Sequence, residues 1–213
     1  MVNIFSSRSM PVGYDQSWEW ETRIADASRF AAWSREVELL RTFFTLPGLL
    51  IPAAGPRILV EINHFQGSLI LQIADPKSEP DPEPLPPLSI CGPQGTGEPI
   101  FTATEVAFNG DASTDDDREA FSITLQDMEA PSSGSCRTRN CPYDLLVVCA
   151  LVRLAHHFPT ICVYSDGGKA AVERGVRICQ QLFGNTAFPR WCFDDVEGAD
   201  QVFSLGEPLP DEG

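Results

Sequence analysis

The stretch PYDLLVVCALVRLAHHFPTICVYSDGGKAAVERGVRICQQLFG, residues 142–184, decides the fold of this 213-residue chain. It opens with Pro142, which a helix tolerates in its first turn because the missing N–H has no partner there. Residues 145–154 are apolar on most sides, and Pro159 ends the helical pattern. This pattern predicts a helix from Pro142 to Phe158 that is buried at the centre of the protein.

The second half of this stretch predicts a strand followed by another helix. Residues 160–164 are rich in β-branched side chains, and the turn 165–168 leads into a helical pattern that stops at Gly184. The buried stripe of that helix is expected at Val172, Val176, Cys179 and Phe183. Residues 190–193 fit a last strand parallel to 160–164, so we expect a C-terminal βα(β) unit.

The N-terminal part of the chain predicts a strand, a helix and a hairpin. The alternation that starts at Trp18 indicates a strand over 18–24, and the helix that follows stops at Pro47 and Gly48. The buried side of that helix is expected at Phe30, Trp33, Val37, Leu40 and Phe44. The segments 57–65 and 69–74 are joined by a short Gly-containing link and form the predicted hairpin.

A second hairpin is predicted from the alternating segments 101–109 and 120–127, which flank an acidic tip at 110–119. Together with the helices, these hairpins predict an α+β fold. We expect a mostly antiparallel sheet with about three helices packed on it.

Acidic residues outnumber basic ones by 30 to 15, which gives a formal net charge of -15 and a pI near 4.4. The segments 75–88, 111–119 and 194–213 contribute -3, -4 and -7 of this charge. Segments of this kind are typical of solvated connectors, and an acidic surface for a basic partner is the alternative. The charge argues against nucleic acid and anionic membranes as partners, because both attract clustered Lys and Arg.

The length suits one α+β domain over residues 1–193. Segment 75–99 contains eight prolines and is interpreted as a long surface excursion from this domain. Segment 194–213 is interpreted as an acidic, flexible tail.

The chain is expected to be a soluble cytoplasmic protein. Its first ten residues lack the apolar stretch of a signal peptide, and its longest apolar run, 145–152, is far shorter than the roughly 20 residues that span a bilayer. Seven cysteines is an odd number, and several fall at predicted core positions. Reduced thiols are therefore expected rather than a disulfide framework.

One candidate ligand site follows the strand at 160–164. It consists of Ser165, Asp166, Gly167, Gly168 and Lys169. The N–H groups at the start of the next helix, with Lys169 nearby, could bind a small anion such as phosphate. The alternative is that Asp166 caps the helix itself, which would repel a second negative group.

Four further residues are candidates for chemistry: His156, His157, Cys136 and Cys141. About 22 Å of helix would separate Cys141 from His156, so a shared metal is excluded, and we expect neither a metal nor a cofactor. Histidines at the end of a helix are also favoured simply by the helix dipole. Arg137 and Arg139 lie beside the two cysteines and could lower the pKa of a thiol, which would make it reactive.

The acidic tip resembles a calcium-binding loop in composition only. Counted from Asp111, Asp116 stands where such a loop needs Gly and Ser122 where it needs Glu, which favours a solvated hairpin end.

A pattern of four short segments is similar to one in uncharacterised intracellular fungal proteins. The segments are Tyr143-Asp144, His156-His157, Ser165-Asp166-Gly167 and Leu182-Phe183-Gly184. The resemblance covers about the last third of the chain up to Gly184 and implies no activity.

Two functions remain from the sequence. The first is a non-catalytic cytosolic protein that acts through a protein-binding or self-assembly surface, in which case assembly predicts a large exposed apolar patch. The second is a small-molecule or phosphate-binding enzyme that uses Ser165–Lys169 together with His156 or His157 as a proton carrier.

Overall fold

The computed structural model describes residues 15–46, 58–63, 68–73, 87–139, 141–165, 168–184, 191–193 and 201–203. Helices and strands in these stretches confirm the predicted α+β class. The main sheet is antiparallel except for one pair of strands.

Three helices are described, namely α1 (Ala27–Thr45), α2 (Asp144–His157) and α3 (Gly168–Phe183). All three were predicted, and α2 lies within two residues of its expected bounds. The carboxylate of Asp26 caps α1 by accepting hydrogen bonds from the N–H groups of Ser28 and Arg29, each at 3.0 Å. Gly184 follows α3 with a φ of +84°, which an L side chain rarely adopts.

Ten strands are described across three sheets. They are β1 (Asp15–Trp20), β2 (Ile58–Asn63), β3 (Ser68–Ile73), β4 (Ile100–Phe101), β5 (Glu105–Phe108), β6 (Phe121–Thr124), β7 (Ser132–Arg137), β8 (Cys162–Ser165), β9 (Trp191–Phe193) and β10 (Gln201–Phe203). The strand orders are β10-β9-β8-β1-β7, β2-β3 and β4-β5-β6. Both predicted hairpins are confirmed, because β2 pairs with β3 and β5 with β6 in antiparallel fashion. Two short 3-10 turns, Ala112–Thr114 and Asp127–Glu129, flank β6.

The C-terminal βα(β) unit is also confirmed, since β9 pairs with β8 in parallel. The strands β4, β7 and β10 were not predicted. β4 is two residues long, and the sequence SSGSCR of β7 shows no apolar alternation. β10 falls within 194–213, the segment interpreted as a tail, while the rest of that segment and residues 75–86 of the proline-rich excursion lie outside the described residues. Residues 87–99 hold no helix or named strand.

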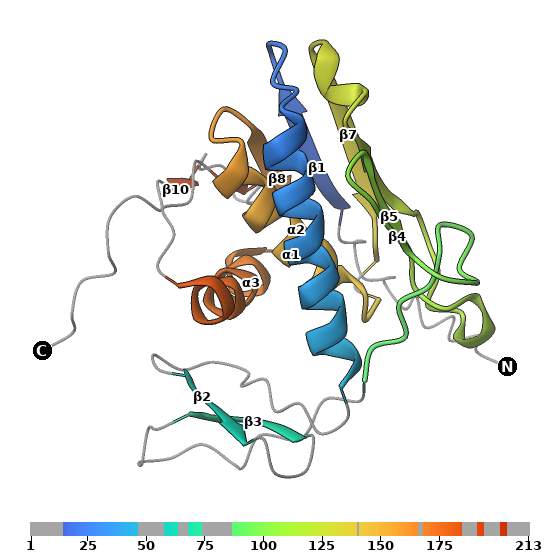
Figure 1. Ribbon diagram of the computed structural model, residues 1–213, viewed down its shortest axis with the longest axis vertical. Coiled ribbons are helices and arrows are strands. Elements are labelled where there is room, and N and C mark those ends of the chain that lie inside the picture. The colour runs from blue at the N-terminus through green and yellow to red at the C-terminus, as the bar shows by residue number, and fades with distance from the viewer. Residues whose placement is uncertain are drawn as a thin grey trace, which may run out of the picture.

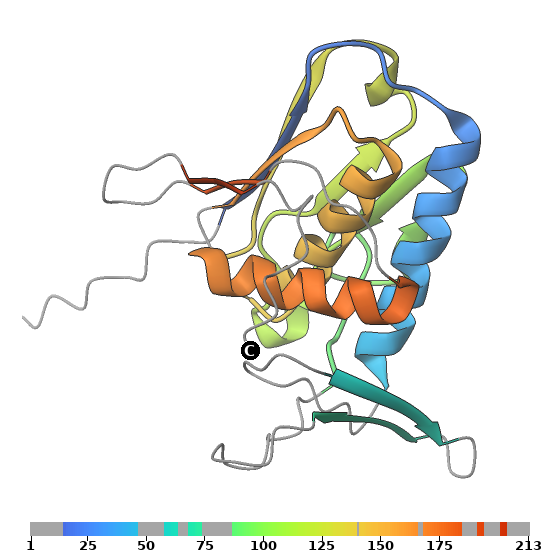
Figure 2. The ribbon, with the colours of Figure 1, turned by 90° about the vertical axis from the view of Figure 1, so that its left-hand side faces the viewer.

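The helices cover one face of the five-stranded sheet. Figure 1 shows α1 in front of α2, and Figure 2 shows the sheet strands as an upper left-hand layer with the helices to their right and below. Along β1 the residues alternate, so that Gln16, Trp18 and Trp20 face the core while the residues between them are half-exposed.

The three-stranded sheet packs against the β1–β7 end of this layer. The indole of Trp18 lies over Gly134, where a Cβ would come within 2.7 Å of the ring, and it meets the ring of Phe121 at 5.2 Å between centroids. Gly134 therefore makes room for Trp18, which explains why β7 carries so little apolar sequence.

The helix α2 forms the centre of the core, as predicted, and every residue from Leu146 to Ala155 is buried. The indole N–H of Trp33 in α1 donates to the carbonyl of Ala150 at 2.9 Å. On the other side Gly175 of α3 packs so closely that a Cβ there would lie 2.5 Å from Cγ1 of Val148. Small residues thus set the approach of α3 to α2.

The described surface carries little exposed apolar side chain. Leu39, 60 % exposed, is the one large hydrophobic residue exposed in the described stretches. The large apolar patch expected for assembly is therefore not found there. Among the same residues, no helix combines the length and hydropathy needed to cross a membrane.

Candidate functional site

The two histidines lie in the last turn of α2, and His157 belongs to an ion network. Its Nε2 lies 2.9 Å from Oε2 of Glu36 in α1, and since a carboxylate only accepts, the ring nitrogen donates. The side chain of His157 is 15 % exposed, and the ring of His156 meets it edge-on at 5.3 Å. The side chain of His157 therefore links α2 to α1.

Arg153 completes the network one turn earlier in α2. Its guanidinium donates to both carboxylate oxygens of Glu36, at 2.7 and 3.0 Å, and lies 4.6 Å from the ring centroid of Phe183 in α3. Burial opposes the charged form of Glu36, but the hydrogen bonds from His157 and Arg153 outweigh it and lower the pKa of Glu36 to about 2. The network joins the three helices around an ion pair whose cation is almost fully buried.

Cys136 is fully buried on the inner face of β7, where its thiol donates to the carbonyl of Glu119 at 3.1 Å. Burial, together with the carboxylates of Glu119 and Asp144, raises the pKa of this thiol well above its usual range. The predicted lowering by neighbouring arginines is wrong for Cys136. Alternation along the strand turns Arg137 to the opposite face, where its Nε donates to Asp15 at 3.0 Å.

Cys141 is half-buried just before α2. Burial raises the pKa of its thiol, and this effect outweighs the opposing influence of the Arg118 guanidinium. The predicted lowering is therefore wrong here too. The histidines stand at the far end of α2, about 20 Å away along 14 residues, so they are not placed to take a proton from Cys141.

The candidate anion site is only partly described. Ser165 is buried and stands opposite Gln16 of β1 in the sheet, Gly168 begins α3, and Asp166, Gly167 and the side chain of Lys169 lie outside the described residues.

The start of α3 lies far from the histidines. The helices α2 and α3 run in the same general direction where they pack. Gly175 of α3 contacts Val148 of α2, and further along both helices Phe183 contacts Arg153. The C-terminal end of α3 therefore lies by the ion network. Its N-terminal end is about 24 Å away, because the helix has 16 residues. Figure 2 shows α3 from the side, with its two ends on opposite sides of the view. The helix N-terminus and the histidines do not form one site.

A buried polar cluster that the sequence reasoning missed joins β1, the residue that follows β7 and the start of α2. Oδ1 of Asp144 accepts hydrogen bonds from Nε2 of Gln16 at 3.1 Å and from the hydroxyl of Thr138 at 2.5 Å. Asp144 lies in the first turn of α2, where the helix dipole favours a carboxylate. A polar Gln16 at the inward parity of Trp18 and Trp20 was the available signal. The cluster fixes the start of α2 on the sheet.

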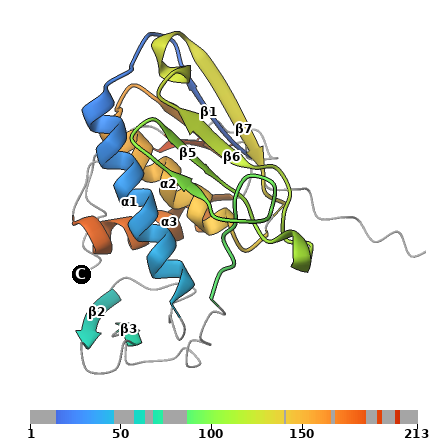
Figure 3. The same ribbon diagram turned by 45° about the vertical axis from the view of Figure 1, so that its right-hand side comes forward.

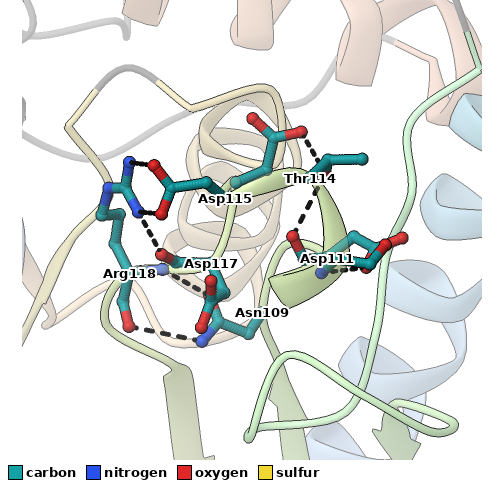
Figure 4. A network of polar contacts seen from close by, with 8 residues as sticks. Asn109, Asp111, Thr114, Asp115, Asp117 and Arg118 are labelled. Carbon is teal, nitrogen blue, oxygen red and sulfur yellow. Dashed lines mark hydrogen bonds and ion pairs between the residues drawn. The ribbon is translucent and has the colours of Figure 1, made fainter.

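The acidic loop, residues 109–119, is organised around Asn109. The side-chain carbonyl of Asn109 accepts from the N–H groups of Gly110 and Arg118, at 2.9 and 3.2 Å. Its amide donates to the carbonyls of Pro93 and Arg118, at 3.2 and 3.4 Å. This buried amide uses four hydrogen bonds to hold both ends of the loop together (Figure 4).

Two carboxylates are held within the acidic loop. Asp111 accepts from the N–H and hydroxyl of Ser113, at 2.8 and 2.7 Å, and from the hydroxyl of Ser89 at 2.8 Å. Asp115, whose side chain is 89 % exposed, accepts twice from Arg118, at 3.1 and 3.3 Å (Figure 4). These hydrogen bonds lower the pKa of both aspartates, so both stay charged and hold a defined position.

A hollow of about 510 Å³ opens beside β5 and β6. It is lined by Thr104, Glu105, Thr124, Leu125, Gln126 and Glu129. The hollow is wide open to solvent, unlike the concave pockets that enclose most of a small ligand. Within the stretches that the structure describes, no three His, Cys, Asp or Glu side chains gather closely enough to hold a metal ion.

Comparison with known proteins gives no relative, since no family model, curated protein or solved structure matches the chain.

Proposed function

We propose that this protein is a non-catalytic cytoplasmic binding module that engages a basic partner protein through the acidic loop. The observation that carries the proposal is the hydrogen-bonded order of the loop. The contacts of Asn109 close it, and those of Asp111 and Asp115 fix carboxylates at its surface. A solvated connector needs no such network, whereas a binding surface gains affinity when its charged groups are fixed before the partner arrives.

The positions of the other candidate residues support a binding role. Cys136 is buried, His157 is bound to Glu36, and the start of α3 lies at the far end of that helix from the histidines. An enzyme would bring a nucleophile or a proton carrier to an accessible hollow. The six cysteines whose side chains the structure describes are free, which agrees with a reducing compartment such as the cytoplasm.

The charge of the chain favours a different protein as partner over a second copy. A net charge of -15 makes identical chains repel each other, and Leu39 alone supplies exposed large apolar surface in the described part. Basic residues on the partner would meet the loop at an on-rate that falls as salt is added.

The test compares affinity capture by the wild-type chain and by the double variant Asp115→Asn, Asp116→Asn. Asp116 lies in the same loop, where its carboxylate accepts from the hydroxyl of Thr114 at 2.7 Å. Asn is well tolerated at the positive φ of 58° that Asp115 adopts, so the variant removes charge without straining the backbone. The matched control, Glu38→Gln with Glu98→Gln, removes two charges from exposed positions elsewhere.

The proposal predicts that captured proteins, once purified, bind the wild type and the control equally. It also predicts that they bind the loop variant about tenfold less tightly, because the two lost charge contacts together are worth about 1.4 kcal/mol. Equal binding to all three proteins would refute a role for the acidic loop.

A further inference from the structure

We propose that the free edge of β7 accepts an extended, basic segment of the partner protein as an additional strand. This inference rests on the proposed function and names the chemistry of the partner. The strand β7 is the last of its sheet in the order β10-β9-β8-β1-β7, and Figure 3 shows it at the outer right of the ribbon. One of its edges pairs with β1, so the other is available.

The pairing register shows which backbone groups face that free edge. The N–H of Arg137 donates to a carboxylate oxygen of Glu119 at 2.9 Å, and its carbonyl accepts from the N–H of Glu119 at 3.4 Å. Both groups therefore point away from β1. Because backbone direction alternates along an antiparallel strand, the N–H and C=O groups of Ser133 and Ser135 point the same way.

These four groups are the docking elements. Ser133 and Ser135 are exposed, and within the described stretches none of their backbone groups has a hydrogen-bond partner. Their side chains are small and turn to the outer face of the sheet, so they do not obstruct a strand that arrives in the plane of the sheet. An added strand would satisfy all four groups, as in recognition by β-augmentation.

The edge also lacks the devices that usually block strand addition. Residues 132–136 contain no charge and no proline, and β7 pairs with β1 residue by residue without a bulge. Natural edge strands generally carry a Lys, a Pro or a bulge to prevent such pairing. Because residues 132–136 lack these features, we infer that this edge pairs with a strand of another protein.

Charge at both ends of β7 selects a basic occupant. At the C-terminal end stand Glu119 and the acidic loop, whose residues 111–119 keep a net charge of -4 although Arg118 pairs with the 89 % exposed Asp115. At the N-terminal end, Asp127 and the 52 % exposed Glu129 precede the strand, and Arg23 pairs with Glu129 at 2.6 Å, so one acidic charge remains there. These groups flank the uncharged residues 132–136, a stretch about 17 Å long, while Arg137 at the end of the strand pairs with Asp15 on the outer face of the sheet. An extended segment with Lys or Arg about six residues apart, and uncharged residues between, would complement both the edge and its flanks.

The experiment uses the full chain, labelled with 15N, and the capped synthetic heptapeptide Lys-Thr-Val-Thr-Val-Thr-Lys as probe. A second peptide with Glu at both ends is the charge control. The inference predicts chemical-shift changes centred on the amides of Ser133 and Ser135, slower hydrogen exchange at both, and binding that weakens with added salt. The acidic peptide is expected to bind at least tenfold more weakly.

The variant Ser135→Pro removes one outward N–H. The hydrogen bonds between β7 and β1 are kept, because the N–H of Ser135 points away from β1. Gly134, the preceding residue, can adopt the backbone conformation that a proline at position 135 requires. The matched variant Ser135→Thr keeps the N–H. We expect the proline variant to bind the basic peptide about tenfold or more weakly than the wild type, and the threonine variant to bind within twofold of it. If the proline variant does not fold, the wild-type exchange data still decide.

Three results would overturn the inference: shifts that lie elsewhere on the surface, equal binding of both peptides, or an edge that is occupied by a second copy. The last would appear as concentration-dependent dimerisation that Ser135→Pro abolishes. If these results occur while captured partners still depend on the acidic loop, the edge inference fails and the proposed function stands. If loop dependence is absent as well, both fail.

Discussion

Arg153 of α2 and Glu36 of α1 form a bidentate ion pair where the two helices meet, with nitrogen–oxygen distances of 2.7 and 3.0 Å. The side chain of Arg153 is 3 % exposed and that of Glu36 is 21 % exposed. An unpaired charge at such a buried position is costly. The pair therefore holds the central helix in register with α1.

Replacing Glu36 is expected to destabilise the protein. Glu36→Gln leaves the buried guanidinium without its counter-charge and should lower the free energy of unfolding by about 3 kcal/mol. Glu38→Gln, on the exposed side of the same helix, should change it by less than about 0.5 kcal/mol. Urea titrations of both variants measure this, and equal stability of the two would show that the ion pair contributes nothing.

The same pair predicts a pH dependence of stability. The pKa of Glu36 falls from an ordinary 4.5 to about 2 on folding, so its contribution is complete above pH 4.5 and is lost as the pH falls towards 2. The stability difference between wild type and Glu36→Gln should therefore be constant from pH 5 to 7 and shrink between pH 4.5 and 2. A difference that stays constant down to pH 2.5 would contradict the assignment.

The contact between α2 and α3 predicts an unusual effect of alanine. Gly175→Ala normally stabilises a helix by about 1 kcal/mol, but here the new Cβ would lie 2.5 Å from Cγ1 of Val148, whose branched side chain is stiff. We expect a net loss of about 1–3 kcal/mol from the clash. Adding Val148→Ala to Gly175→Ala should recover part of the loss, which a double-mutant cycle by thermal unfolding would measure.

The cysteines predict an unreactive interior. Cys136 and Cys149 are fully buried, and burial raises the pKa of both thiols. At pH 8, iodoacetamide should modify them only as fast as the protein unfolds, while half-buried Cys91 reacts sooner. Peptide mass spectrometry over a time course distinguishes these rates. Fast modification of Cys136 in the folded protein would contradict this prediction and show that the thiol is reactive.

The sequence predicted those elements whose side chains alternate or repeat against the core. The helix α2 and the pair β8–β9 were foreseen because long apolar segments and turn residues mark them. The strand β7 was missed because its inner face offers Gly134 to a tryptophan from another strand, a partner that local sequence does not show. Packing between residues that are distant in the sequence also determines the positions and contacts of the candidate site residues.

The candidate site shows the same limit. The prediction that arginines activate Cys136 considered neighbours along the chain, whereas strand alternation places Arg137 on the other face. The network of Asn109 depends on Pro93 and Arg118, which approach it only after the chain has turned back on itself. The sequence located the acidic tip but gave no sign of its internal order.

Hydrogen exchange of the full chain bound to its captured and purified partner tests the central claim most directly. A protein that recognises a basic partner through its acidic loop and the adjoining edge should gain protection at residues 109–119 and 132–137, with little change along α3. Protection confined to the start of α3 or to the histidine end of α2, with none at the acidic loop, would contradict the account.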